Sequence, residues 1–275
     1  MSCCNEDKPG KLGRRDMLKA TAAIAAVAAG TTGFAAKAGA AENPYADPKK
    51  GALPKTDVVV ELKNTALVLT DPQIDFLSPK GVTWKVVGKS VTEHNTVANM
   101  LSLLKAAKEV GMTVAISPHY YYPTDHGWKF TGPLEKLMHA IGMFDRKSPT
   151  SGAGFEGSGA DYMPEFKPYI LDGKTIVCSP HKVYGPQQND LNLQLRKARI
   201  DKVILGGMSA NLCTQAHLYD LLENGYEVAV VRDATAAAQL PEGDGYLSAI
   251  INFRFVANAL WTTKEAVKRI KASKA

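Results

Sequence analysis

Short apolar runs that alternate with helix-like segments constrain the fold of this chain more than any other feature. The run TALVLTD at residues 65–71 is almost continuously apolar, which is typical of a strand buried on both faces of a sheet. Residues 90–110 then place apolar side chains at helical spacing, and this pattern stops at Gly111. Five further apolar runs indicate strands: MTVAISP (112–118), KTIVCSP (174–180), DKVILGG (201–207), YEVAVVRDA (226–234) and NALWTT (258–263). The alternation predicts a three-layer α/β/α domain in which helices cover both faces of a mostly parallel sheet of about six strands.

A functional site is expected where these strands end, because ligands of open parallel sheets bind beyond the carboxyl ends of the strands. Four ends carry polar or reactive side chains: Asp71, the region of His119, the turn at 178–182, and the stretch GGMSANLC at 206–213. A long irregular stretch at 118–172 separates the second strand from the third. Loops of this length within a domain are usually functional.

The first forty residues differ in composition from the rest. Arg14 and Arg15 precede an alanine-rich, weakly apolar run that ends in small residues, which resembles a bacterial twin-arginine export signal. The run is too short and too rich in Ala and Gly for a permanent membrane span. We therefore expect a signal peptide at 1–40, a linker at 41–57 and a single domain at 58–275, with the mature protein in the periplasm.

The net charge of the chain bears on the partners that it could bind. The formal net charge is +6, and residues 1–40, with six basic and three acidic side chains, contribute half of it. The remainder lacks a cluster of basic and aromatic residues, so nucleic acid is not an expected partner.

Cys178 and Cys213 lie outside the expected signal. They could form one disulfide in the periplasm or stay free if the protein folds before export, and the sequence leaves both possibilities open.

The stretch GMSAN at 207–211 nearly matches the G-x-S-x-G nucleophile elbow of α/β-hydrolases. That chemistry needs a histidine base, which in α/β-hydrolases follows both the serine and the acid in the chain. The six histidines are at positions 94, 119, 126, 139, 181 and 217, so none follows Asp233, the obvious acid candidate. We therefore interpret Ser209 as a turn residue or helix cap rather than as a nucleophile.

Cys213 is the alternative nucleophile. It falls near the first turn of a helix expected to start around Ser209, where unpaired N–H groups and the helix dipole favour a thiolate. Asp71 and Lys182, which follow the first and third strands, complete a consistent set. The lysine would lower the pKa of the thiol, and the carboxylate would accept the thiol proton. Each residue by itself also has a structural explanation: Cys213 as a buried apolar side chain, Asp71 as a turn residue and Lys182 as a surface charge.

Three separated motifs carry a family resemblance over most of residues 60–262. LVLTDPQIDFL resembles the first strand of the isochorismatase-like cysteine hydrolases, with Asp71 and Gln73 at the family's positions. HKVYGPQQNDL resembles the lysine segment of that family, which places its lysine at Lys182. VILGGMSANLCTQAHLYDLLENGYEVAVVRDATAA resembles its nucleophile segment, with Cys213 as the nucleophile. The resemblance implies a Rossmann-like strand order, an amidase or nicotinamidase type of activity and a homo-oligomer.

The resemblance also implies the details of the site. The peptide bond between Met208 and Ser209 would be cis, and the backbone N–H groups of Ser209 and Cys213 would form the oxyanion hole. The catalytic residues would be Asp71, Lys182 and Cys213. Four further residues close to the strand ends are expected to contact the substrate: Gln73, Phe76, His119 and Tyr184.

No cofactor and no metal are expected. TDPQIDF follows the first strand, where a dinucleotide site would have G-x-G-x-x-G. Family members that hydrolyse nicotinamide bind a metal through a D-x-H element after the second strand. This chain has Ser117, Pro118 and His119 there, without the acidic ligand. His119 and His126 together with Asp125 are an alternative zinc-binding set.

We interpret the sequence as that of a cysteine hydrolase that cleaves a carbon–nitrogen bond of a small amide through a thioester. The alternative is a non-catalytic binding or redox-responsive protein on the same fold, in which Cys213 oxidises reversibly. The two differ at Asp71, because only the hydrolase needs its carboxylate for proton transfer. Hydrolysis of a vinyl ether, as in isochorismatases themselves, does not use a cysteine nucleophile, so Cys213 argues against it.

Overall fold

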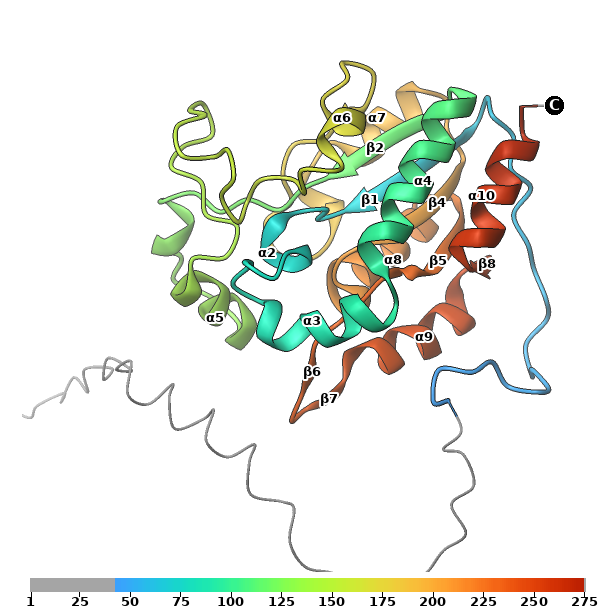
Figure 1. The fold of residues 1–275 in the computed structure, drawn as a ribbon, viewed down its shortest axis with the longest axis horizontal. Coiled ribbons are helices and arrows are strands. Elements are labelled where there is room, and N and C mark those ends of the chain that lie inside the picture. Colours follow the sequence, from blue (N-terminus) through green and yellow to red (C-terminus); the bar gives the residue numbers. More distant parts are fainter. Residues whose placement is uncertain (1–42, 275) are drawn as a thin grey trace, which may run out of the picture. The chain divides into compact units, whose positions relative to one another are not determined.

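A sheet of six strands in the order β3-β2-β1-β4-β5-β8 forms the centre of the molecule (Figure 1). The computed structural model describes residues 43–274. Every neighbouring pair of these strands is parallel. The strands are β1 (Thr65–Thr70), β2 (Thr113–Ser117), β3 (Ile176–Val177), β4 (Lys202–Gly207), β5 (Glu227–Thr235) and β8 (Ala259–Trp261). The prediction of a mostly parallel sheet of about six strands is confirmed.

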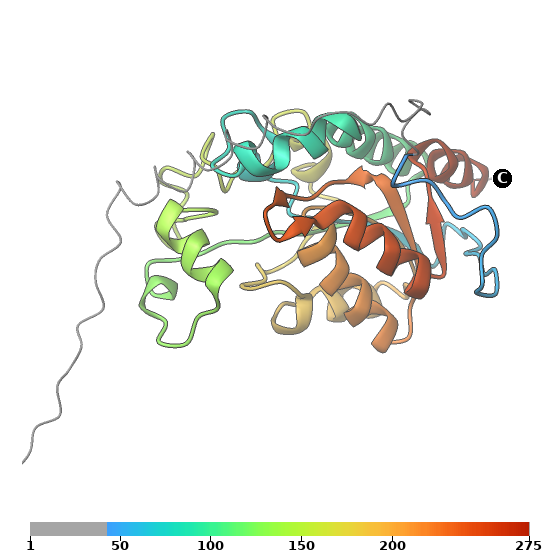
Figure 2. The same ribbon diagram turned by 90° about the horizontal axis from the view of Figure 1, so that it is seen from below.

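Helices cover both faces of this sheet, which confirms the predicted three layers (Figure 2). The helices on one face are α3 (Trp84–Glu93), α4 (Thr96–Val110) and α10 (Thr263–Ala272). Those on the other face are α7 (Leu191–Lys197), α8 (Gln215–Glu223) and α9 (Gly245–Val256). A short antiparallel hairpin, β6 (Gln239–Leu240) with β7 (Gly243–Asp244), precedes α9.

Alternate residues of the central strands pack into the two hydrophobic cores. In β1, Leu67 and Leu69 belong to the core under α3, α4 and α10, whereas Ala66 and Val68 belong to the core under α7, α8 and α9. This alternation follows from the two-residue period of a strand. Because both faces of β1 are buried, the four residues between its terminal threonines are all apolar.

The strand order contains a switch point between β1 and β4. From β1 the chain continues to β2 on one side, and from β4 it continues to β5 on the other side. Open α/β sheets bind their ligands at such a point. Asp71 directly follows β1, and the segment with Cys213 follows β4, so the topology places these two residues at the same end of adjacent strands.

Strand β3 is shorter than the expected strand at 174–180. It lies at the edge of the sheet, and the N–H of Ser179 donates to the Asp190 carboxylate (2.6 Å) instead of to a strand. The chain nevertheless stays extended as far as an isolated parallel bridge between His119 and His181. This bridge brings the two histidines side by side.

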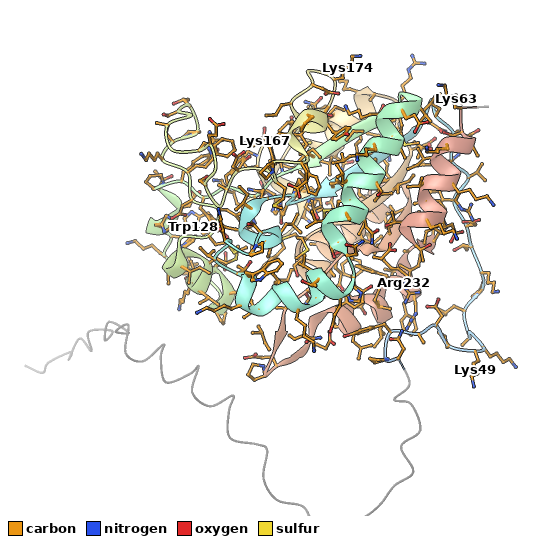
Figure 3. The ribbon with its side chains drawn as sticks, in the orientation of Figure 1. Lys49, Lys63, Trp128, Lys167, Lys174 and Arg232 are labelled. Atoms are coloured by element: carbon orange, nitrogen blue, oxygen red, sulfur yellow. The ribbon has the colours of Figure 1, made fainter. Side chains whose placement is uncertain are left out.

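The long stretch between β2 and β3 is packed against the domain. It contains α5 (Pro133–Ile141) and α6 (Lys167–Ile170), and its Tyr121 and Phe144 are fully buried. The Tyr121 ring contacts Trp128, which is labelled in Figure 3. The stretch therefore forms a fixed wall beside the strand ends.

Residues 44–57, expected as a linker, contact the domain through ion pairs. Asp47 pairs with Arg232 and Arg254, each at 2.9 Å, and Arg232 is labelled in Figure 3. The predicted signal peptide at 1–40 lies outside the described residues. Among residues 43–274 we find no helix with the length and apolar character needed to cross a membrane.

Candidate active site

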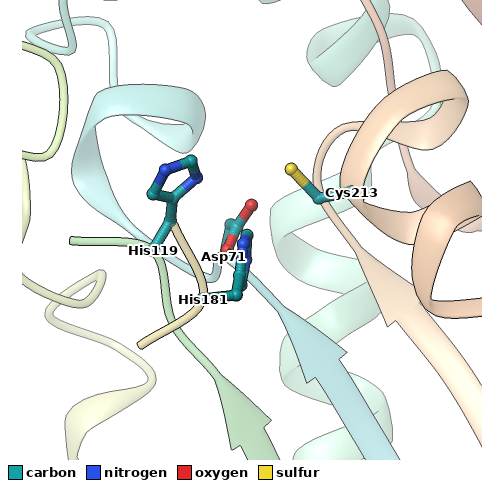
Figure 4. A group of neighbouring side chains, drawn as sticks. All are labelled: Asp71, His119, His181 and Cys213. Atoms are coloured by element: carbon teal, nitrogen blue, oxygen red, sulfur yellow. Dashed lines mark hydrogen bonds and ion pairs between the residues drawn. The ribbon is translucent and has the colours of Figure 1, made fainter. Parts of the chain in front are cut away.

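Four buried side chains meet beyond the carboxyl ends of β3, β2, β1 and β4. They are His181, His119, Asp71 and Cys213, in the order of the strands that carry them (Figure 4). One nitrogen, oxygen or sulfur atom from each lies within 4.8 Å of the others. None of the four is more than 3% exposed. The structure thus brings together Asp71, Cys213 and His119, all expected from the sequence, and adds His181.

The backbone at Asp71 has an unusual conformation. Its φ angle is 45°, which lies in the left-handed region, and the following residue is Pro72, which disfavours helical backbone before it. The N–H of Asp71 donates to the Ser117 carbonyl (3.1 Å), and its own carbonyl accepts from the N–H of Gln73 (2.7 Å). Strained backbone of this kind is concentrated at functional sites.

The two carboxylate oxygens of Asp71 have different environments. Oδ1 lies 2.7 Å from Nε2 of His181, and both side chains are fully buried. Oδ2 has no hydrogen-bond partner among the residues that the structure describes. Asp71 is therefore held through one oxygen and leaves the other available to a ligand.

The turn that carries Cys213 is fixed by a glycine. Gly207, the last residue of β4, has a φ angle of 121°, and a Cβ atom there would lie 2.2 Å from the Thr70 carbonyl oxygen. Only glycine fits this position. The peptide bond one residue further along, between Met208 and Ser209, is cis.

Two threonines join the turn to β1. Cys213 lies on a single π-helical turn, Ala210–Thr214, which leads into α8. The hydroxyl of Thr70 lies 3.0 Å from the carbonyl of Met208 and 3.0 Å from the hydroxyl of Thr214. These buried contacts fix the distance between the end of β1 and the turn with Cys213.

The Cys213 thiol is expected to be protonated in the free protein. Burial, followed by the negative charge of Asp71, raises its pKa well above the ordinary range, and the backbone N–H groups of Ser209 and Cys213 act in the opposite direction with smaller effect. The sequence predicted the reverse, a pKa lowered by Lys182 and by the helix start. The prediction was wrong because the thiol is buried beside a carboxylate instead of a lysine. Cys178 and Cys213 are both free, so they form no disulfide with each other.

Lys182 lies outside the four-residue cluster. Its Nζ atom is 2.5 Å from Asp125 Oδ2 and 2.9 Å from the carbonyl oxygen of Tyr120, and it lies over the ring of Tyr122. Adjacent side chains of an extended segment point to opposite sides, so His181 and Lys182 cannot both face Asp71. The side that faces Asp71 is occupied by His181, which corrects the sequence-based placement of the lysine.

A buried histidine on α8 supports the nucleophile turn. Nδ1 of His217 is 2.7 Å from the Cys213 carbonyl, which can only accept, so Nδ1 is the donor. Nε2 lies 2.8 Å from the hydroxyl of Ser117, which in turn accepts from the side chain of Asn189 (2.9 Å). Burial lowers the pKa of His217 well below its ordinary value. A neutral imidazole that donates through Nδ1 and accepts through Nε2 satisfies all of these contacts.

Gln73 was expected to contact the substrate, but its amide is engaged with the protein backbone. Its Nε2 donates to the carbonyls of His119 (2.9 Å) and Ala160 (2.7 Å), and its Oε1 accepts from the N–H of His119 (2.9 Å). Gln73 therefore holds His119 in place. Phe76, also expected at the substrate, is buried against Phe144 in the core.

Tyr184, the remaining expected substrate contact, lines a cavity to which none of the four cluster residues contributes. The cavity has a volume of about 360 Å³ and includes Ala216, which lies one residue before His217 on α8. Burial raises the pKa of Tyr184, so its hydroxyl stays protonated. The cavity is lined by residues 182–185 together with Gln187, Gln188 and Ala216.

The alternative zinc-binding set of the sequence is not assembled. Nε2 of His126 lies 2.8 Å from Asp145, and Asp125 pairs with Lys182, whereas His119 lies in the cluster with Asp71. Sequence reasoning missed His181 and His217. The strand alternation before His181 and the spacing of four residues between Cys213 and His217 on one helix face are signals that could have indicated them.

Comparison with known proteins identifies the family of the chain. The family model of the isochorismatase domain matches residues 65–259. Similar solved structures include a cysteine hydrolase from Pseudomonas syringae pv. phaseolicola 1448A, with 20% identity, a TM-score of 0.66 and coverage of 81% of this chain and 100% of that chain. An isochorismatase family protein from Desulfovibrio vulgaris subsp. vulgaris str. Hildenborough has 18% identity, a TM-score of 0.58 and coverage of 76% and 99%.

A third similar structure is N-carbamoylsarcosine amidase from Thermoplasma acidophilum, with 19% identity, a TM-score of 0.52 and coverage of 73% of this chain and 96% of that chain. At these identities the solved structures show a common fold. The family model extends from β1 to β8 and includes the segments of Asp71 and Cys213. The chain therefore belongs to the isochorismatase family.

Proposed function

We propose that this protein is a cysteine hydrolase that cleaves a carbon–nitrogen bond of a small amide. One observation carries the proposal: the Cys213 thiol and the Asp71 carboxylate lie in one buried cluster at the sheet's switch point, with one carboxylate oxygen unpartnered among the described residues. A thiol next to a free carboxylate oxygen is the arrangement that a cysteine nucleophile with its own base requires.

The first half of the reaction forms a thioester. Asp71 accepts the thiol proton, and the Cys213 sulfur bonds to the amide carbonyl carbon. The carbonyl oxygen becomes an oxyanion. We propose that the backbone N–H groups of Ser209 and Cys213 stabilise it, since both also favour the thiolate. When the carbon–nitrogen bond breaks, Asp71 transfers its proton to the leaving nitrogen, and the amine departs.

The second half regenerates the enzyme. Asp71, again a carboxylate, accepts a proton from water as the water oxygen bonds to the thioester carbon. The carbon–sulfur bond then breaks, and the proton returns to the sulfur. The products are a carboxylic acid and the Cys213 thiol, so one amide and one water are consumed.

His181 takes the place that the family resemblance gives to a lysine. Its Nε2–H donates to Asp71 Oδ1, which leaves Oδ2 for proton transfer. We propose that His181 orients the Asp71 carboxylate and stabilises its negative charge.

The substrate is proposed to be small. The cavity beside Tyr184 has a volume of about 360 Å³, which is near the lower limit for small-molecule sites. The fold shared with N-carbamoylsarcosine amidase supports a carbon–nitrogen bond as the target.

The test is turnover of a panel of small amides by the wild type, Asp71→Asn and Cys213→Ser, with Cys178→Ser as a control for a buried thiol outside the cluster. We expect the wild type and Cys178→Ser to release amine from at least one amide. Asp71→Asn should lower the rate by about 10²-fold or more, and Cys213→Ser should abolish it. Rapid-quench intact mass spectrometry should detect a thioester adduct in the wild type.

One result would replace the proposal with the redox alternative. If no amide is hydrolysed and hydrogen peroxide oxidises Cys213 reversibly at equal rates in the wild type and Asp71→Asn, the protein is a thiol sensor.

We further propose export by the twin-arginine route. Replacement of Arg14 and Arg15 by lysine should retain the protein in the cytoplasm, as cell fractionation would show.

A further inference from the structure

We propose that the cluster of Asp71, His119, His181 and Cys213 is also a binding site for one divalent cation of the zinc type. This inference goes beyond amide hydrolysis, although it shares residues with that proposal. It rests on the donor set, on the buried atoms that lack partners and on the hydrogen bonds that orient the ligands.

The donor set is the one that zinc prefers. Zinc is bound in proteins by cysteine sulfur, histidine nitrogen and aspartate oxygen, most often by four ligands. The cluster offers one cysteine sulfur, two histidine nitrogens and one aspartate oxygen, all within 4.8 Å of one another. Tetrahedral zinc bonds of about 2.0–2.3 Å place the ligands somewhat closer together than this limit. Small side-chain rotations would bring the four atoms into contact with one ion.

Three polar atoms of the cluster lack partners although their side chains are fully buried. They are Asp71 Oδ2, His119 Nδ1 and His181 Nδ1, none of which has a hydrogen bond to the part of the chain that the structure describes. Buried polar atoms in native proteins nearly always have a partner. Three such atoms in one cluster, next to a thiol, indicate a ligand with several bonds.

Hydrogen bonds at the outer side of the cluster favour metal binding. Nε2 of His119 lies 2.9 Å from the carbonyl oxygen of Lys182, which can only accept, so Nε2 carries the hydrogen and Nδ1 has the free lone pair. Gln73 fixes the backbone of the same residue through its N–H and carbonyl. Metal-binding histidines typically donate their other ring N–H to a carbonyl or carboxylate in this way.

The proposed site differs from the D-x-H arrangement that the sequence lacks. Ser117, at the position of that acidic ligand, has its hydroxyl between His217 and Asn189. His126, the other candidate ligand, is paired with Asp145. The ligands proposed here are instead the residues of the hydrolytic site.

Metal binding would therefore compete with hydrolysis. As the cation binds, the S–H bond of Cys213 breaks, a sulfur–metal bond forms and the proton leaves to solvent. The nucleophile and Asp71 are then both occupied by the metal. We expect zinc to be a reversible inhibitor, so that the chain exists as a metal-free hydrolase and a metal-bound resting form.

The experiment measures metal binding directly. Full-length protein without a polyhistidine tag, in a background with Cys3→Ser and Cys4→Ser, is stripped with EDTA and titrated with Co²⁺ or Zn²⁺. We expect one equivalent to bind, and the cobalt form to show a thiolate-to-cobalt charge-transfer band. Cys213→Ser should lose this band, and His119→Gln should weaken binding by more than about tenfold. Cys178→Ser and His126→Gln are matched controls and should bind as the wild type does.

Two results would overturn the inference: wild-type protein that binds no metal tightly, or binding with a thiolate band that survives in Cys213→Ser. The charge-transfer band of the wild-type protein is by itself evidence of a sulfur ligand. A variant that fails to fold therefore does not decide the outcome. Amide turnover is measured on the same stripped samples. Turnover without metal binding leaves the proposed function intact, and metal binding without turnover leaves the metal site intact.

Discussion

Nε2 of His181 lies 2.7 Å from Oδ1 of Asp71, and both side chains are completely buried. A buried carboxylate is stable only with a partner, and loss of that partner is more costly than loss of a surface ion pair. The family resemblance would give this role to Lys182. That lysine is instead partly exposed and paired with Asp125.

A pair of substitutions distinguishes His181 from Lys182 as the partner of the Asp71 carboxylate. His181→Leu, which keeps the volume but removes the hydrogen bond, should lower the free energy of unfolding by about 3 kcal/mol or more, because it leaves the Asp71 carboxylate buried without a partner. Lys182→Met should cost about 1 kcal/mol or less. Urea unfolding followed by circular dichroism measures both. The reverse order of the two costs would assign the partner of Asp71 to Lys182.

Ser117, whose hydroxyl contacts His217, should contribute more to the free energy of unfolding than an exposed serine does. The hydroxyl of Ser117 is fully buried between His217 and Asn189. Ser117→Ala leaves Nε2 of His217 without a partner and should cost about 1–3 kcal/mol of unfolding free energy. The control is Ser102→Ala on the exposed face of α4, where the hydroxyl donates to the carbonyl of Ala98. That change should stay within about 0.5 kcal/mol, and equal effects at the two serines would contradict the buried network.

The fold was predictable from the sequence because its strands are buried on both faces. The continuous apolar runs that became β1 and β4 have no other simple explanation in a chain with intervening helices. The same rule failed at β3, which lies at the edge of the sheet. There, the Asp190 side chain takes a backbone N–H that a strand would otherwise pair.

The site was predictable at the strand ends and less so between them. Asp71 and Cys213 follow central strands directly, so topology alone places them together. His181 lies four residues beyond the short edge strand β3, so the alternation of that strand indicates the direction of its side chain only if the chain stays extended as far as the bridge to His119. The family motif drew attention to Lys182, whose side chain takes the opposite direction.

The turn before Cys213 should accept no side chain at Gly207. A Cβ there would lie 2.2 Å from the Thr70 carbonyl oxygen, and the φ angle of 121° is accessible only to glycine. We expect Gly207→Ala to lower the free energy of unfolding by about 3 kcal/mol or more. Gly111 is the matched control, since it also has a positive φ angle (75°) but open space around its Cα. Gly111→Ala should cost about 1–2 kcal/mol, and thermal unfolding compares the two.

Stability at acid pH should depend on Asp172. Burial tends to raise its pKa, but the Lys108 ammonium (2.7 Å) and the backbone N–H groups of Lys174 and Thr175 outweigh this effect and lower the pKa to about 2. Because the pKa is lower in the folded protein, the carboxylate stabilises the fold above its ordinary pKa of about 4. This contribution is lost as the pH falls through about 2.

Asp172→Asn should therefore destabilise the protein at pH 7 by about 1 kcal/mol after allowance for solvent screening, and by close to nothing near pH 2. Urea unfolding at a series of pH values measures the difference. In a Lys108→Met background the difference should shrink at pH 7, because the ammonium supplies part of the stabilisation. A difference that is independent of pH would show that the Asp172 carboxylate acts through its shape and hydrogen bonds instead of its charge.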